Sequence, residues 1–161
     1  MKRNTCLIRE SKPDCLPSAE QLVRWNWLGD EHRKVCGQIE TTQHIFFVYF
    51  IANYCWWTYH DALFWSLTPI NLQQFLNLSS GRGDVPKPRM IFLLACICWS
   101  LWLIRNDFVF NNKIITSPDV VVHRSIIFMQ KWSILFKEKE ISWISKTVEK
   151  LSRHLALNVQ D

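Results

Sequence analysis

The sequence has little glycine, with four residues among 161, and this scarcity limits the number of tight turns. Two-residue β-hairpins favour Asn-Gly, Asp-Gly or similar pairs, because the turn positions need positive φ angles. A protein of many short strands is therefore disfavoured. Long apolar stretches with few breaks favour helices instead.

The N-terminal segment lacks the apolar core of a secretory signal peptide over residues 1–16. We therefore expect an intracellular protein, cytoplasmic or nuclear and not secreted. In a reducing compartment the cysteines are expected to be free thiols. Cys96 and Cys98 are two apart and do not face each other on a helix, so they form neither a redox pair nor a metal clip. The six cysteines are at positions 6, 15, 36, 55, 96 and 98.

Catalytic motifs are also absent from the sequence. There is no glycine-rich phosphate loop, no His-Glu-x-x-His pair and no Tyr/Phe-x-Asp-Asp motif of a polymerase. Asp30 and Glu31 are adjacent and Asp61 stands alone, which provides no carboxylate cluster for two-metal chemistry. We expect no enzyme and no small-molecule substrate.

The composition that is present is that of a folded domain. Hydrophobic residues make up 48% of the chain and charged residues 20%, and nine tryptophans raise the aromatic share to 14%. The net charge of +5 is compatible with a nucleic acid or another acidic partner. The dense run Lys137–Glu140 alternates in sign and is typical of a solvated helix face.

Capping and turn signals divide the chain into helices. Ser18 and Asn71 are in positions typical of a helix start. Ser117 as N-cap and Pro118 in the first turn open a further helix. The Ser/Gly/Pro-rich stretch 79–88 is the clearest loop. The predicted helices cover residues 19–27, 46–63, 72–78, 89–111, 118–140 and 142–157.

The apolar segment Met90–Ile104 could be either a core helix or a membrane span. As a helix it would extend about 22 Å, which is shorter than the ~30 Å hydrocarbon core of a bilayer. Arg105 and two polar residues follow at once. We therefore expect a central buried helix, apolar on all sides, around which the others pack, and we expect no membrane partner.

The stretch around Cys36 and His44 has the appearance of half a zinc site. A glycine follows the cysteine, and the histidine comes eight residues later. Residues 34–35 and 43–45 could pair as short strands around this turn. A structural zinc site needs four protein ligands, so two more would be required.

The spacing of these residues resembles the zinc-binding domain found downstream of the reverse transcriptase in plant LINE-type (non-LTR) retrotransposons. Its pattern is C-x2-C-x7-H-x4-C, with Glu-Thr-Thr before the histidine and Phe-Phe after it. The stretch Ser18–Glu31 is similar to the preceding helix, and Trp99–Phe110 to a following W-x2-W-x2-RN-x3-F element. The matching residues of the ligand region are Cys36, Gly37, Glu40, Thr41, Thr42, His44, Phe46 and Phe47.

The resemblance implies a domain over roughly residues 18–111. We expect an irregular segment at 1–17 before it and a helical tail at 112–161 packed on it. The expected fold is mainly α, with a small zinc-knuckle-like β-hairpin followed by a helical bundle around a central apolar helix. Family members contain zinc and face nucleic acid beside a reverse transcriptase.

Two of the four ligand positions depart from this pattern. Arg33 and Tyr49 stand where the first and last cysteines belong. Arginine keeps its proton and repels a metal, and tyrosine ionises near pH 10. Neither His32 nor Cys55 is placed to substitute for them. Cys36 and His44 are therefore remnant ligands, and we expect no bound zinc.

The expected function is that of a degenerate, non-catalytic remnant that binds RNA or DNA. The basic residues best placed to touch phosphate are Arg24, Arg33, Lys34 and Arg105. The alternative is a helical protein-interaction module based on the apolar series of helix 118–140. The oligomeric state is left open. Expected core residues are Trp25, Trp27, Phe46, Phe47, Trp56, Trp57, Trp99 and Trp102.

Overall fold

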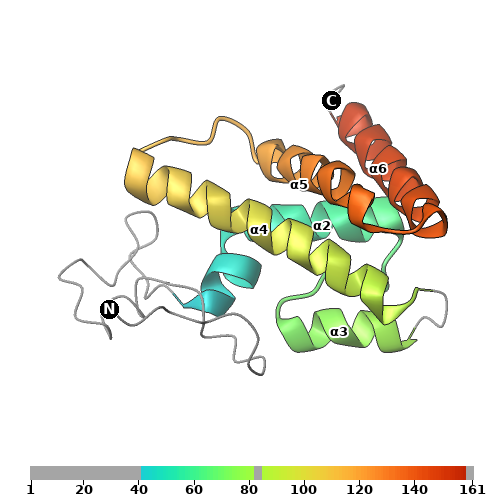
Figure 1. The fold of residues 1–161 in the computed structure, drawn as a ribbon. Helices are drawn as coiled ribbons and strands as arrows, with labels where there is room; N and C mark the ends of the chain where they lie inside the picture. The colour runs from blue at the N-terminus through green and yellow to red at the C-terminus, as the bar shows by residue number, and fades with distance from the viewer. Residues whose placement is uncertain (1–40, 82–84, 159–161) are drawn as a thin grey trace, which may run out of the picture. The chain divides into compact units, whose positions relative to one another are not determined.

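The computed structural model of the chain describes residues 41–81 and 85–158, and every regular element in these ranges is a helix. Met1–His44 and Ile45–Asp161 form two separate compact units. Nearly all of the described residues belong to the second unit (Figure 1). The predicted segment 1–17 and the predicted helix 19–27 lie outside the described residues.

The second strand of the predicted hairpin, residues 43–45, is helical, so the prediction of a β-hairpin is wrong. Its intended partner, residues 34–35, lies outside the described residues. The segment His44–Val48 forms a π-helix, η2. A strand would direct successive side chains to opposite faces. Three successive side chains are buried here instead, those of Ile45, Phe46 and Phe47.

The predicted helix 46–63 is present in two pieces. Thr41 opens the first, because its Oγ1 accepts a hydrogen bond from the backbone N–H of His44 at 3.1 Å. Tyr49 then interrupts the helix with extended backbone angles, φ −60° and ψ 143°. The second piece is α2, Phe50–Leu63.

The next two helices lie near the predicted ranges 72–78 and 89–111, but each extends into the predicted loop 79–88. Asn71 caps α3, Leu72–Gly81, by accepting a hydrogen bond from the backbone N–H of Gln74 at 2.8 Å. The long helix α4 covers Lys87–Asn111. It ends where Asn112 adopts a left-handed conformation, with φ 52°.

The predicted helix that runs to Glu140 is wrong, because two helices occupy this stretch. The first, α5, covers Asp119–Trp132, and a short 3-10 turn, η3, follows at Ser133–Leu135. Phe136 is extended, with φ −112° and ψ 160°. The last helix, α6, covers Glu138–Asn158 and begins earlier than predicted.

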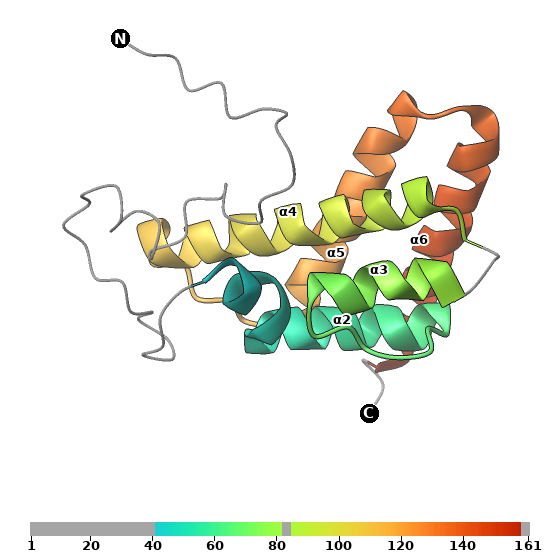
Figure 2. The same ribbon diagram turned by 90° about the horizontal axis from the view of Figure 1, so that it is seen from below.

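Contacts distant in sequence join these helices within the second unit. Helix α5 packs along α4 and also contacts α2 and α6, while α3 packs on α4 (Figures 1 and 2). The buried hydroxyls of Tyr59 on α2 and Ser125 on α5 are 2.8 Å apart. The rings of Phe92 on α4 and Phe136 meet edge to face at 4.8 Å.

The core centres on Trp56, which is fully buried. Its ring stacks on Phe47 at 5.3 Å with an angle of 3° between the planes. Its indole Nε1 donates to the backbone carbonyl of Phe46 at 2.6 Å. Trp57 and Trp99 were also expected in the core, but they are 48% and 44% exposed.

The prediction that α4 is enclosed on all sides is wrong as well. One stripe of this helix, formed by Ile91, Ala95 and Trp99, is exposed. These residues repeat every four positions and so lie on one side of the helix. Among the described residues α4 alone is long and apolar enough to cross a membrane, a test that core helices can also pass.

Candidate functional site

One of the two predicted remnant zinc ligands, His44, is described, and Cys36 and Arg33 lie outside the described residues. The backbone N–H of His44 takes part in the turn capped by Thr41. Tyr49 stands where the resembled pattern has its last cysteine. Its carbonyl accepts the N–H of Asn53 at 2.8 Å, so this residue starts α2.

Cys55 was considered as a substitute ligand, and the structure places its thiol in the core. The residue is 0% exposed, and burial raises the pKa of its thiol far above the usual value. Zinc binds the thiolate form, which this environment disfavours. Over residues 41–81 and 85–158, no three His, Cys, Asp or Glu side chains gather as a metal site.

Arg105 belongs to the W-x2-W-x2-RN-x3-F element, and its side chain lies among residues of the same element. The guanidinium carbon is 5.2 Å from the ring centroid of Trp102 and 5.4 Å from that of Phe110. Its Nη1 donates to Oδ1 of Asn106 at 2.9 Å. Such cation–π contacts stabilise a charge that is removed from water. These residues therefore form one contact cluster on α4.

Arg105 is the one predicted nucleic-acid contact that lies among the described residues. Arg24, Arg33 and Lys34 lie outside the described residues. Arg105 is 4% exposed. A phosphate contact by Arg105 would require its guanidinium to leave the two aromatic rings, so its role in binding stays a prediction.

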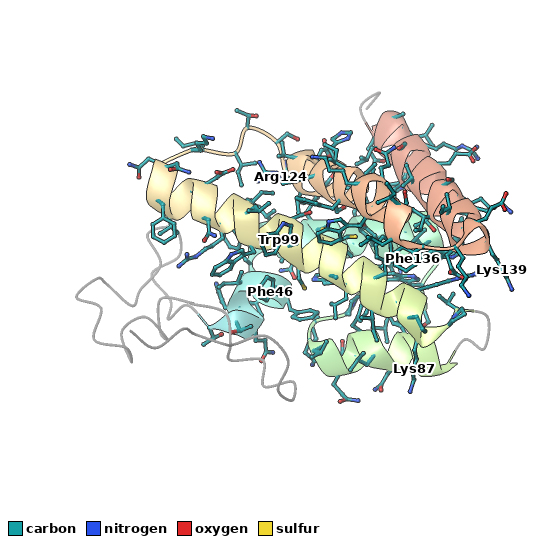
Figure 3. All side chains as sticks on the ribbon, in the orientation of Figure 1. Phe46, Lys87, Trp99, Arg124, Phe136 and Lys139 are labelled. Atoms are coloured by element: carbon teal, nitrogen blue, oxygen red, sulfur yellow. The ribbon has the colours of Figure 1, made fainter. Side chains whose placement is uncertain are left out.

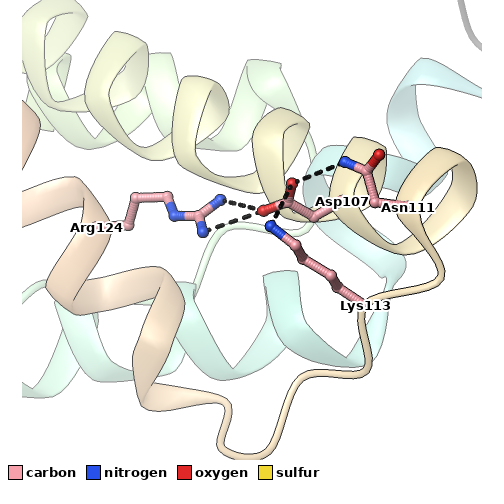
Figure 4. A network of polar contacts seen from close by, with 4 residues as sticks. All are labelled: Asp107, Asn111, Lys113 and Arg124. Atoms are coloured by element: carbon pink, nitrogen blue, oxygen red, sulfur yellow. Dashed lines mark hydrogen bonds and ion pairs between the residues drawn. The ribbon is translucent and has the colours of Figure 1, made fainter.

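Asp107, two residues further along α4, is the centre of a polar network with α5 (Figure 4). Its Oδ2 accepts hydrogen bonds from Nη1 and Nη2 of Arg124, both at 3.2 Å. Asn111 Nδ2 donates to Oδ1 at 3.3 Å, and Lys113 Nζ is 3.9 Å from the same oxygen.

The pKa of the Asp107 carboxyl is set by opposing effects. Burial alone would raise this pKa, but the hydrogen bonds from Arg124 and Asn111 and the charges of Lys113 and Arg124 outweigh it. The net pKa is below the usual value. A carboxylate that is ionised and fully engaged is suited to joining α4 to α5 and not to accepting protons in catalysis.

A small cavity lies among α2, α4 and α6, with a volume of about 110 Å³. Its walls include Trp65, Leu93 and Trp143, and Lys150 is its one titratable lining residue. Pockets for small ligands usually measure ~300–1,000 Å³. This cavity is too small, and has too few polar or titratable side chains in its lining, to indicate a substrate site.

Sequence reasoning missed the role of Arg89, the first residue of the predicted helix 89–111. Its Nε donates to Oε2 of Glu140 at 2.6 Å, and its Nη2 donates to Oε1 at 3.1 Å. The guanidinium also lies 5.1 Å from the ring centroid of Trp143. The alternating run 137–140 suggested only solvated charges, so no local signal indicated this pair.

Comparison of the chain with protein-family models, curated proteins and solved structures finds no match. The resemblance to the retrotransposon domain therefore rests on the residues of this sequence. The function must be argued from those residues and from their geometry.

Proposed function

We propose that the chain is a non-catalytic remnant of the reverse transcriptase zinc-binding domain of plant LINE-type retrotransposons, with nucleic acid as partner and without structural zinc. The observation that carries the proposal is that residues of the resemblance take part in ordered packing. Arg105 contacts Trp102, Asn106 and Phe110 on α4. A motif whose members pack together has a structural reason for its spacing.

The Phe-Phe pair that follows His44 supports the loss of zinc. Phe46 and Phe47 are buried. The indole N–H of Trp56 donates a hydrogen bond to the Phe46 carbonyl, and the Trp56 ring stacks on Phe47. Burying a large aromatic side chain contributes a few kcal/mol, about 2–3 for each ring. Apolar packing of this kind maintains the segment without a metal ion.

Nucleic acid as partner is supported by charge. The chain has a net charge of +5. Contacts between Lys or Arg and phosphates give affinity without reading sequence. No reaction is proposed, because the sequence contains no recognised catalytic motif.

Zinc analysis of the purified protein tests the loss of the metal site. The native chain and the double variant Arg33→Cys, Tyr49→Cys are compared by elemental analysis. We expect a folded, metal-free native chain and about one zinc per molecule in the restored variant. About one zinc in the native chain, or none in a folded restored variant, would contradict the proposal.

Binding to single-stranded RNA, measured across a salt series, tests the partner. We expect the affinity of the native chain to fall steeply with salt. The variant Arg33→Gln, Lys34→Gln should bind more weakly with a shallower slope. Lys146→Gln, a change at an exposed position on α6, is the matched control. Equal affinity in all three proteins would oppose this assignment of the binding residues.

A protein-interaction module remains the second proposal, and the exposed stripe of α4 favours it. Ile91 is 55% exposed and Trp99 44%. Exposed apolar patches are typical of sites that bind other proteins. Association through this stripe should be nearly independent of salt and should be lost in Trp99→Ser. RNA binding should not change in that variant.

A further inference from the structure

The connection between α5 and α6 exposes two large apolar side chains side by side in sequence. We use the name α5–α6 tip for residues 133–137. Ile134 is 82% exposed and Leu135 78%. The neighbouring helix α5 exposes Ile127 by only 47%. These two adjacent aliphatic side chains therefore form a highly exposed apolar surface at one end of the bundle.

The tip is held in place by its neighbours. Ser133 Oγ donates to the carbonyl of Gln130 at 2.6 Å, and the N–H of Phe136 donates to the carbonyl of Ser133 at 3.0 Å. The ring of Phe136 packs inward against Phe92. The exposed pair is therefore presented on an ordered turn, which lowers the entropic cost of binding.

Basic side chains flank this apolar pair in the sequence. Lys131, Lys137 and Lys139 are exposed and form no ion pair with any described residue (Figure 3 labels Lys139 and Phe136). Two acidic residues lie at the same end. Glu138 is exposed, and Glu140 is neutralised by Arg89.

A further basic residue lies close to this end of the bundle. The Arg89–Glu140 pair sets the first turn of α4 beside the first turn of α6. Exposed Lys87 lies in that turn of α4. The charge around the tip is therefore positive.

We propose that the α5–α6 tip is a contact site for an anionic lipid surface. Ile134 and Leu135 enter the boundary between headgroups and acyl chains, and Lys131, Lys137 and Lys139 contact the lipid phosphates and carboxylates. Apolar side chains flanked by lysines are the composition of interfacial membrane contacts. This peripheral contact differs from the sequence-based expectation that the chain has no membrane partner.

The apolar pair distinguishes a lipid surface from nucleic acid as the partner of the tip. Ile134 and Leu135 gain nothing from a solvated phosphate backbone, whereas their transfer into a bilayer interface removes them from water. The lysines favour an anionic bilayer over a neutral one, since each adds attraction to an anionic surface. The inference is independent of the proposed nucleic-acid role, because its residues are different.

Co-sedimentation of the full chain with vesicles tests the proposal. One set of vesicles is phosphatidylcholine alone, and the other mixes phosphatidylcholine and phosphatidylserine at about three to one. We expect binding to the anionic set only. The variant Ile134→Ser, Leu135→Ser should reduce the partition coefficient about tenfold or more. The variant Lys131→Gln, Lys137→Gln, Lys139→Gln should reduce it about a hundredfold.

Ile114→Ser is the matched control, because Ile114 is also 82% exposed and follows the opposite end of α4. We expect it to bind vesicles as the native chain does. Equal binding to neutral vesicles, or an equal loss in Ile114→Ser, would overturn the proposal. So would a tip variant that loses RNA binding as strongly as vesicle binding. Tip-dependent self-association without vesicle binding would assign the surface to a second copy of the chain.

Discussion

Arg89 and Glu140 form a pair with two hydrogen bonds that joins the first turn of α4 to the first turn of α6. The two residues are 51 positions apart in sequence. The guanidinium also covers the ring of Trp143, one turn further along α6. Bidentate geometry of this kind is more specific than an ordinary surface ion pair.

Replacing Glu140 by Ala should destabilise the bundle, because it removes both hydrogen bonds and leaves Arg89 without its carboxylate. We expect a decrease of about 2–4 °C in the unfolding midpoint, measured by circular dichroism. Glu138→Ala is the matched control, since that exposed glutamate makes no described ion pair. A similar decrease in both variants would show that the pair adds nothing specific.

The stability of the protein should fall as the pH is lowered below about 4.5. The Arg89 hydrogen bonds lower the pKa of Glu140 from its ordinary value of 4.5. The net pKa of Asp107 is also lowered, from 3.8. The unfolded chain therefore takes up these protons at a higher pH than the folded chain.

The contribution of each carboxylate is thus present above the unfolded-state pKa and is lost as the pH falls through the folded-state pKa. Urea unfolding between about pH 6 and pH 3 measures this dependence. The variant Glu140→Gln should show a shallower loss over the same range. An identical slope in the variant and the native chain would contradict the role of Glu140.

Trp56→Phe should cost about 1–3 kcal/mol in the free energy of unfolding. The variant loses the hydrogen bond to the Phe46 carbonyl, leaves that acceptor unpaired and opens space beside Phe47. Trp57→Phe is the control next to it in sequence, where the side chain is 48% exposed. We expect a change within about 0.5 kcal/mol there. Equal losses in urea unfolding would contradict the burial of Trp56.

The buried hydroxyls of Tyr59 and Ser125 should respond unequally to mutation. Ser125 Oγ donates to the Val122 carbonyl at 2.7 Å, so Tyr59 is the donor in the pair. Tyr59→Phe leaves Ser125 with one partner and should cost about 1 kcal/mol. Ser125→Ala leaves the Tyr59 hydroxyl buried without its acceptor and should cost about 1–3 kcal/mol.

A double-mutant cycle in urea measures the coupling of these two residues. The double variant should cost less than the sum of the single changes, because no buried hydroxyl is then left unpaired. Additive losses would indicate that the two hydroxyls do not interact.

Helices with local boundary signals could be predicted from the sequence, and α3 and α4 show why. Asn71 caps α3 through its own side chain, and the apolar run of α4 is bounded by the Pro-rich loop and by Asn112. The break between α5 and α6, after Trp132, contains no glycine or proline that would predict it from the sequence. Phe136 has an extended backbone, and its ring packs against Phe92. This contact joins distant parts of the sequence and leaves no local signal.

The errors at the candidate site have a related origin. The predicted strand 43–45 is too short to show a periodicity that distinguishes a strand from a helix. Arg105 was predicted to touch phosphate, although aromatic residues three before and five after it indicate a stacked guanidinium. The zinc ligands, by contrast, were argued from spacing, and that argument stays a prediction where the residues lie outside the described ranges.

The packing of α2 against α6 has a consequence for the order in which the chain matures on the ribosome. His154 lies on α6, yet its Nδ1 is 3.4 Å from Oδ2 of Asp61 and its ring meets that of Trp57 at 5.9 Å. Helix α2 is synthesised before α6, so its partner surface emerges later. Until α6 is synthesised, the face of α2 that carries Trp57 and Asp61 lacks this partner. Translation that stops before Glu138 would release a product unable to close its own bundle.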